Sequence, residues 1–162
     1  MRLELCYDCH TPNHQDGKNP TYISYGNSLY FVKWFYPLEV FQFDESNYRP
    51  QIVYQDRNSP INDRYRGGTA GFPTPEKDVF MGFGHYTLTE RNAKHYPFIW
   101  KLNMKTCFLE TRLLKDARFS NITDPITIIE VDKKYYLITA ESNDVWFVNQ
   151  DYITNVWEIQ FD

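Results

Sequence analysis

The feature that most constrains the fold is a repeat of paired aromatic strands. Residues 29–32, 79–82 and 135–138 are short β-branched or aromatic runs that begin 50 and then 56 residues apart. Each run follows a turn-forming pair of residues and precedes a second aromatic strand, at residues 40–44, 99–103 and 156–162. A period of this size in a chain dominated by strands is typical of propeller blades, because one small sheet cannot bury both of its faces alone.

Strand signals occur along most of the chain, whereas the only helical candidate is a short stretch at residues 113–117. Runs of β-branched and aromatic residues between Gly, Pro, Asn and Asp clusters predict strands. The predicted strands are residues 21–24, 28–35, 39–43, 51–54, 79–87, 96–103, 107–111, 127–131, 134–141, 145–148 and 155–161. The sequence therefore predicts an all-β fold.

The number of strands predicts a partial β-propeller of about three blades, forming one propeller-like domain over residues 1–162. Closed propellers typically have four to eight blades. Three blades leave two open faces, so we expect the chain to be a segment of a larger propeller. Closure by self-association and a sandwich with a similar repeat are the alternatives.

Composition narrows the possible partners. The net charge is −4 and there is no basic run. Proteins that bind nucleic acid carry a basic patch or stripe, so the sequence argues against nucleic acid as a partner. No apolar run is long enough to span a membrane, and no signal peptide is visible, so the expected location is cytoplasmic or virus-associated. Aromatic residues make up 18% of the chain. This content is more typical of a β-sheet core, and it also favours binding surfaces on which sugars stack.

Several segments resemble a known family. Lys18-Asn19-Pro20 with residues 22–38, the Arg66-Gly67-Gly68-Thr69 run, and residues 81–87 (MGFGHYT) are similar to motifs of five-bladed propeller domains. These domains accompany glycosyltransferases of giant DNA viruses, and they are similar to mannoside-phosphorylase and glycosidase propellers. The segments at residues 95–98, 122–125 and 155–158 extend the resemblance to the last blade. The early blades, where the phosphorylases carry a general-acid carboxylate, have no counterpart here.

The candidate ligand site combines a basic run with a glycine-flanked histidine. Glycines allow a close approach of backbone to a ligand, and arginine binds phosphate or carboxylate through two parallel hydrogen bonds. The resemblance implies that Arg66 and His85 hold phosphate or a sugar hydroxyl, and we expect His85 to be reachable. The predicted ligand-binding residues are Arg66, Gly67, Gly68, Thr69, His85, Tyr86 and Trp34. The alternative is a structural bulge in which Arg66 pairs with Asp63.

The remaining acidic residues and the N-terminal cysteines are each explained without a functional role. Asp124 next to Pro125 indicates a turn, and residues 141–144 indicate a solvated polar loop. Cys6, Cys9 and His10 match the C-x-x-C-H pattern, but crowding and the missing export signal favour free thiols with no metal. No cofactor is expected.

Two functions follow from these patterns. The first is a carbohydrate-active or glycan-binding propeller unit that resembles a glycosidase or phosphorylase, or assists a glycosyltransferase, with a glycan or sugar phosphate as its partner. The second is a non-catalytic structural or interaction module, such as a viral surface or scaffold protein. An enzyme of the first kind needs two carboxyl groups roughly 5–10 Å apart, and a binding module does not.

Overall fold

Every regular element of the described chain is a β-strand. The computed structural model describes residues 19–44, 49–89, 93–143 and 151–160. The strands are β1 (Thr21–Tyr25), β2 (Ser28–Phe35), β3 (Leu38–Asp44), β4 (Arg49–Gln55), β5 (Tyr65–Arg66), β6 (Phe72–Pro73), β7 (Val79–Thr89), β8 (Ala93–Asn103), β9 (Phe108–Leu113), β10 (Ile122–Val131), β11 (Lys134–Ser142) and β12 (Ile153–Ile159).

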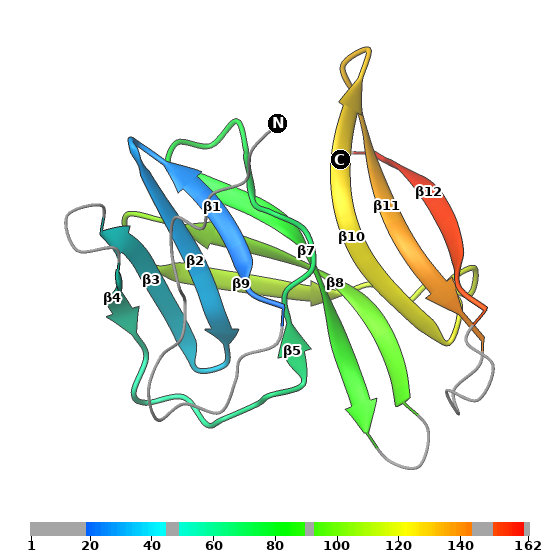
Figure 1. The fold of residues 1–162 in the computed structure, drawn as a ribbon, viewed down its shortest axis with the longest axis horizontal. Helices are drawn as coiled ribbons and strands as arrows, with labels where there is room; N and C mark the ends of the chain where they lie inside the picture. Colours follow the sequence, from blue (N-terminus) through cyan, green and yellow to red (C-terminus); the bar gives the residue numbers. More distant parts are fainter. Residues whose placement is uncertain (1–18, 45–48, 90–92, 144–150, 161–162) are drawn as a thin grey trace.

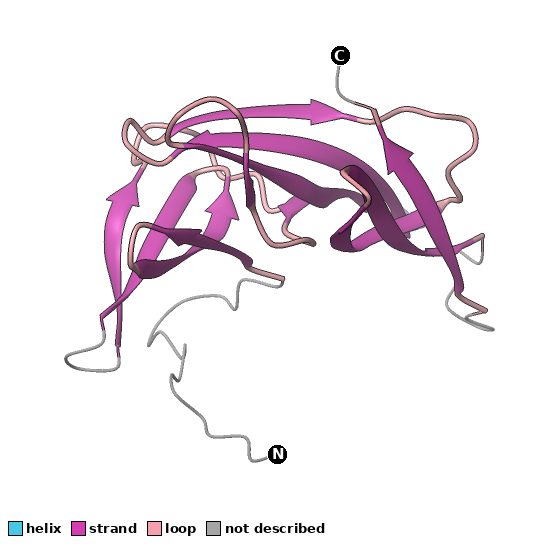
Figure 2. Cartoon of the chain, turned by 90° about the horizontal axis from the view of Figure 1, so that it is seen from above, coloured by secondary structure: helices cyan, strands magenta, loops and turns pink. Residues whose placement is uncertain are grey.

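These strands form three successive antiparallel groups, which we call blades (Figure 1). Blade I consists of β1–β4, blade II of β5–β9, and blade III of β10–β12. Blades II and III share one sheet, but a single parallel residue pair, Ile122 with His95, joins β10 to β8. In Figure 2 the described strands follow an arc rather than a closed ring. The chain is thus an all-β partial propeller, as the sequence predicts.

The three segments of the repeat lie in equivalent strands of the three blades. Residues 29–32, 79–82 and 135–138 lie in β2, β7 and β11, and each of these strands is paired on both sides by other strands of its blade. The preceding strand is β1 in blade I, the two-residue β5 and β6 in blade II, and β10 in blade III. Two residues are too few to produce an alternating pattern, so the first strand of blade II has no sequence signal.

Most other strand predictions are confirmed to within a few residues. β10 begins at Ile122, before the predicted residue 127, because the Asp124-Pro125 pair lies inside the strand beside a register shift rather than in a turn. The weak helical candidate at residues 113–117 is not a helix, since Leu113 ends β9 and the following residues are irregular. The strand predicted at residues 145–148 lies outside the described residues.

Blades I and II pack together through a large aromatic core. The ring of Phe35 on β2 lies 5.3 Å from that of Phe98 and 6.0 Å from that of Trp100, both on β8. Trp100 and Phe98 are fully buried. Edge-to-face aromatic pairs contribute about 0.5–1.5 kcal/mol beyond area burial. The remaining buried members of the cluster are Ile23, Val32, Leu38, Val40, Phe80 and Leu102.

Side chains alternate between the two faces of β7 and β8, and this alternation determines which residues of blade II face blade III. Because Phe98 and Trp100 face blade I, the residues between them on β8 and their partners on β7 occupy the opposite face. On that face His95 lies opposite Thr87, and Lys101 lies opposite Met81. This face of blade II carries the polar groups described below.

Glycines at the inner edge of blade II allow three backbones to meet. A Cβ atom on Gly67 would lie 2.1 Å from the carbonyl oxygen of Asn19, just before β1. A Cβ atom on Gly68 would lie 2.7 Å from the carbonyl oxygen of Pro125 on β10. Gly67 and Gly68 therefore lie between residues at the first strands of blades I and III, where no larger side chain fits.

Candidate functional site between blades II and III

Three polar side chains from three strands converge between blades II and III. The carboxylate Oδ1 of Asp124 on β10 lies 2.6 Å from Nδ1 of His95 on β8 and 3.6 Å from Nδ1 of His85 on β7. The two imidazole rings are stacked, with centroids 4.7 Å apart and an interplanar angle of 19°. We call this group the His–His–Asp cluster. It is partly open to solvent, because His95 and Asp124 are 17% and 26% exposed.

His85 is the buried member of the cluster. Burial is the main cause that lowers the pKa of His85, Asp124 raises it, and the neighbouring His95 and Arg66 lower it; the net result is a pKa of about 4. The imidazole of His85 is therefore neutral near pH 7 and has an unprotonated nitrogen. Its ring is only 4% exposed, so the expectation that His85 is reachable from solvent is wrong.

The structure places the predicted basic run beside this cluster. Arg66 on β5 lies directly opposite His85 on β7 in the antiparallel register, so both side chains belong to one face. Arg66 Nε donates a hydrogen bond to the carbonyl oxygen of Asp63 at 3.3 Å, rather than to its carboxylate. The buried hydroxyl of Thr69 donates to the carbonyl oxygen of Ala70 and accepts from the amide of Phe83.

Protein atoms, rather than an open binding space, surround the predicted glycines. Gly67 and Gly68 face the neighbouring first strands, as described above. A Cβ atom on Gly84 would lie 2.3 Å from the carbonyl oxygen of Arg66 and 2.6 Å from the ring of Phe98. These glycines permit close packing, which corrects the interpretation that they clear space for a ligand.

The two predicted aromatic residues are not part of the cluster. Tyr86 is adjacent to His85 on β7 and therefore points to the opposite face, where its ring contacts Tyr65 at 4.8 Å. Trp34 lies on β2 in blade I, next to the core residue Phe35. The structure thus brings Arg66 and His85 together but leaves Tyr86 and Trp34 elsewhere.

A groove of about 1040 Å³ lies on the same face of blade II, farther from the cluster along β7 and β8. Phe72 on β6 and Tyr135 on β11 stack there with ring centroids 5.7 Å apart and an interplanar angle of 15°. This stack bridges blades II and III. The groove is lined by these two rings and, among others, by Lys101, Glu110 and Arg112.

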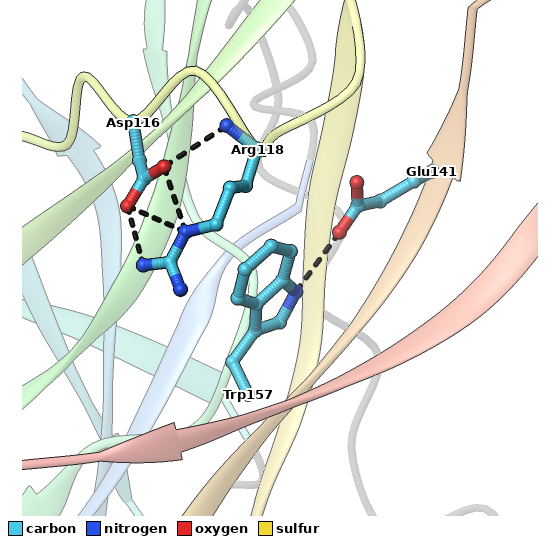
Figure 3. A network of polar contacts seen from close by, with 4 residues as sticks. All are labelled: Asp116, Arg118, Glu141 and Trp157. Atoms are coloured by element: carbon cyan, nitrogen blue, oxygen red, sulfur yellow. Dashed lines mark hydrogen bonds and ion pairs between the residues drawn. The ribbon is translucent and has the colours of Figure 1, made fainter.

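Blade III contains a second polar network, centred on a buried carboxylate (Figure 3). Glu141 Oε1 accepts hydrogen bonds from Thr139 at 2.6 Å and from the indole nitrogen of Trp157 at 2.9 Å. Its Oε2 accepts from the backbone amide of Ser120 at 3.1 Å. Glu141 has no exposed surface, so the prediction of a solvated polar loop at this residue is wrong.

Arg118 covers the other side of this network. Its guanidinium lies 5.5 Å from the centroid of the Trp157 ring and forms two-pronged hydrogen bonds with Asp116. The side-chain hydrogen bonds from Arg118 lower the pKa of Asp116 to about 2. Because Asp116 and Arg118 are exposed, this pair orients the guanidinium over the ring more than it stabilises the fold.

Sequence reasoning missed His95 as a polar site residue and treated Asp124 as a turn. The two residues are 29 positions apart, and their contact depends on the single residue pair between β8 and β10. No local motif signals a contact of this kind. A histidine near the start of β8 and an aspartate near the start of β10, two strands later in the chain, were the available clue.

Comparisons with known proteins agree with the fold. No family model matches the sequence, and no curated protein matches it. Two solved structures of Cellvibrio cellulosa alpha-L-arabinanase are similar, and arabinanases have a five-bladed β-propeller fold. The structure complexed with arabinohexaose has a TM-score of 0.53 and 12% identity, with 88% of this chain matching 53% of that chain. The other has a TM-score of 0.51 and 16% identity, with 89% of this chain matching 54% of that chain.

These comparisons show the propeller fold and also how much of a whole propeller the chain matches. The chain spans about half the length of the arabinanases to which it is similar. Within the described residues, there is no helix with the length and apolar character needed to cross a membrane.

Proposed function

We propose that this chain is a glycan-binding propeller unit and that the glycan lies in the groove between blades II and III. The observation that carries the proposal is the chemistry of this groove. The stacked rings of Phe72 and Tyr135 provide an aromatic surface, and Lys101, Glu110 and Arg112 provide hydrogen-bonding groups around it. Flat rings that pack on sugar C–H faces, together with polar side chains that bind hydroxyls, form a typical oligosaccharide site.

Two further observations support this proposal. The volume of the groove, about 1040 Å³, is at the upper end of the range for ligand sites. One of the similar structures is an arabinanase complexed with arabinohexaose, an oligosaccharide. The fold of this chain is therefore one that holds an oligosaccharide in at least one other protein.

Binding is better supported than cleavage. Hydrolysis of a glycosidic bond ordinarily needs two carboxyl groups on opposite sides of the bond. Glu110 is the only carboxylate among the described residues that line the groove. The fully buried Glu141 accepts hydrogen bonds from Thr139, Trp157 and the Ser120 amide, and is not available to a substrate.

A finer version of the proposal follows the sequence resemblance. In this version the chain supplies later blades of a propeller that accompanies a glycosyltransferase of a giant DNA virus, and its ligand is a glycan or a sugar phosphate. Arg66 would then contact the ligand at the inner end of the same face, beside the His–His–Asp cluster. The neighbouring coding sequence would test this version directly.

The binding experiment uses calorimetry with arabinohexaose and with manno-oligosaccharides. Tyr135→Ala removes one ring of the stack and is expected to weaken binding about tenfold, which corresponds to about 1.4 kcal/mol. Tyr136→Ala is the matched control, because Tyr136 is adjacent on β11 and faces away from blade II. If no oligosaccharide binds, or if both variants bind like the wild type, the groove is not a glycan site.

A second candidate function, an interaction module, is favoured by the outward face of blade III. Ile129 and Val131 on β10 and Val156 on β12 share this face and are 42%, 48% and 61% exposed. A further propeller blade would cover such a face. Self-association through this surface is the corresponding prediction and is tested below.

A further inference from the structure

We propose that the His–His–Asp cluster binds a divalent transition-metal ion, with Zn²⁺ as the expected ion. The three ligands would be one imidazole nitrogen each from His85 and His95 and a carboxylate oxygen from Asp124. This inference does not depend on glycan binding, because the cluster and the groove share no residue. It goes beyond the sequence interpretation, which expected no metal.

The positions of the three groups fit one ion. One ligand atom from each residue lies within 4.8 Å of the other two, and this is the only such group of His, Cys, Asp or Glu among the described residues. Ligand atoms around four-coordinate zinc, with bonds of about 2.0–2.1 Å, lie about 3.3 Å apart. Small rotations of the three side chains therefore suffice to form the site.

The ligand types favour a transition metal over calcium or magnesium. Two imidazoles and one carboxylate are a common set for zinc and related transition metals, whereas calcium and magnesium prefer oxygen ligands. The 2.6 Å hydrogen bond between His95 and Asp124 occupies the position that the ion would take. The ion would replace the shared proton.

A buried hydroxyl on the same face provides an independent indication. Thr87 is 6% exposed, and its Oγ1 has no hydrogen-bond partner in the described structure. Thr87 lies directly opposite His95 and two residues from His85, so its side chain shares their face of the sheet. A buried hydroxyl without a partner is costly. A water molecule on the ion would give this hydroxyl a partner and fill the fourth coordination position.

An ion in the His–His–Asp cluster would connect blades II and III. His85 and His95 belong to blade II and Asp124 belongs to blade III. Among the described residues, the Ile122–His95 pair alone links the two blades through the sheet. The ion would therefore join two blades at the place where their backbone connection is weakest.

The test is zinc titration by calorimetry in a background that lacks the N-terminal metal-binding residue types. The full chain with Cys6→Ser, Cys9→Ser, His10→Gln and His14→Gln retains only two histidines, His85 and His95. We expect it to bind one Zn²⁺ per chain and to show no measurable binding of Ca²⁺. Loss of all zinc binding in this background, or equal binding of both ions, would overturn the proposal.

Three single substitutions in that background then identify the ligands. His85→Gln, His95→Gln and Asp124→Asn are each expected to weaken Zn²⁺ binding at least tenfold. Arg66→Ala is the control, since removal of a nearby cation is expected to leave zinc affinity unchanged or increased, although it would weaken an anionic or glycan ligand. Circular dichroism confirms that each variant is folded. Unchanged zinc affinity in the folded His95→Gln variant would refute the site even if His85→Gln fails to fold.

Discussion

Replacement of Glu141 by glutamine tests whether the buried carboxylate is a structural anchor of blade III. The carboxylate accepts from Thr139 and Trp157 through one oxygen and from the amide of Ser120 through the other. Glutamine has the same shape but only one acceptor oxygen, so at least one donor must face an NH₂ group. A buried donor without a partner costs about 1–3 kcal/mol. We expect Glu141→Gln to lower the free energy of unfolding by about that amount.

Urea denaturation monitored by tryptophan fluorescence measures this change. Glu158→Gln is the matched control, because Glu158 lies on the adjacent strand β12, is 42% exposed and pairs with Lys134 only at the surface. An exposed pair of this kind contributes about 0–1 kcal/mol. If Glu141→Gln and Glu158→Gln differ by less than about 0.5 kcal/mol, the carboxylate network does not stabilise the blade.

The same substitution has a defined pH dependence. Burial alone would raise the pKa of Glu141, but hydrogen bonds from Thr139, the Ser120 amide, Asn155 and Trp157 together lower it below its ordinary value. An unfolded glutamate titrates near pH 4.3. The stabilisation is therefore fully present above about pH 4.3 and is lost as the pH falls through the lower pKa of the folded state. The stability difference between wild type and Glu141→Gln should shrink below pH 4.3, and a constant difference would contradict the assignment.

Three further substitutions test the packing of the blades. Gly84→Ala would place a methyl group 2.3 Å from the carbonyl oxygen of Arg66 on β5. We expect about 1–3 kcal/mol of destabilisation, measured as a lower melting temperature. A variant as stable as the wild type would show that β5 can shift away. Trp100→Ala empties the core between blades I and II and should cost about 3–5 kcal/mol in urea unfolding, whereas a loss below 1 kcal/mol would mean that this core is not formed. Val156→Glu should shift light-scattering mass toward the monomer, and a wild type that is already monomeric at high concentration would refute association through blade III.

The sequence predicted the strands well because each one carries its own signal. The alternating pattern of β2, β7 and β11 depends on local residues and on burial of one face, so the strand positions and the approximate blade spacing follow from the chain alone. β5 and β6 contain two residues each and could not be predicted in this way.

The candidate site was less predictable because its contacts are long-range. The sequence resemblance grouped Arg66 with His85, and the structure places them opposite each other on β5 and β7. The contact of His95 with Asp124 depends on how blade III meets blade II, which no local pattern encodes. Gly68 was assigned to ligand approach for the same reason, because the sequence does not show that Pro125 fills the space beside it.

The two interfaces between blades differ in kind, and this difference has a consequence for how the chain unfolds. Blades I and II share a buried aromatic core around Phe35 and Trp100. The described contacts of blade II with blade III are one residue pair, one aromatic stack, a polar cluster and the packing of Gly68 against Pro125. Blades I and II should therefore open as one cooperative unit, and blade III should open separately at a lower free energy. In native-state hydrogen exchange, the amides shared by β11 and β12 would then exchange before those shared by β7 and β8.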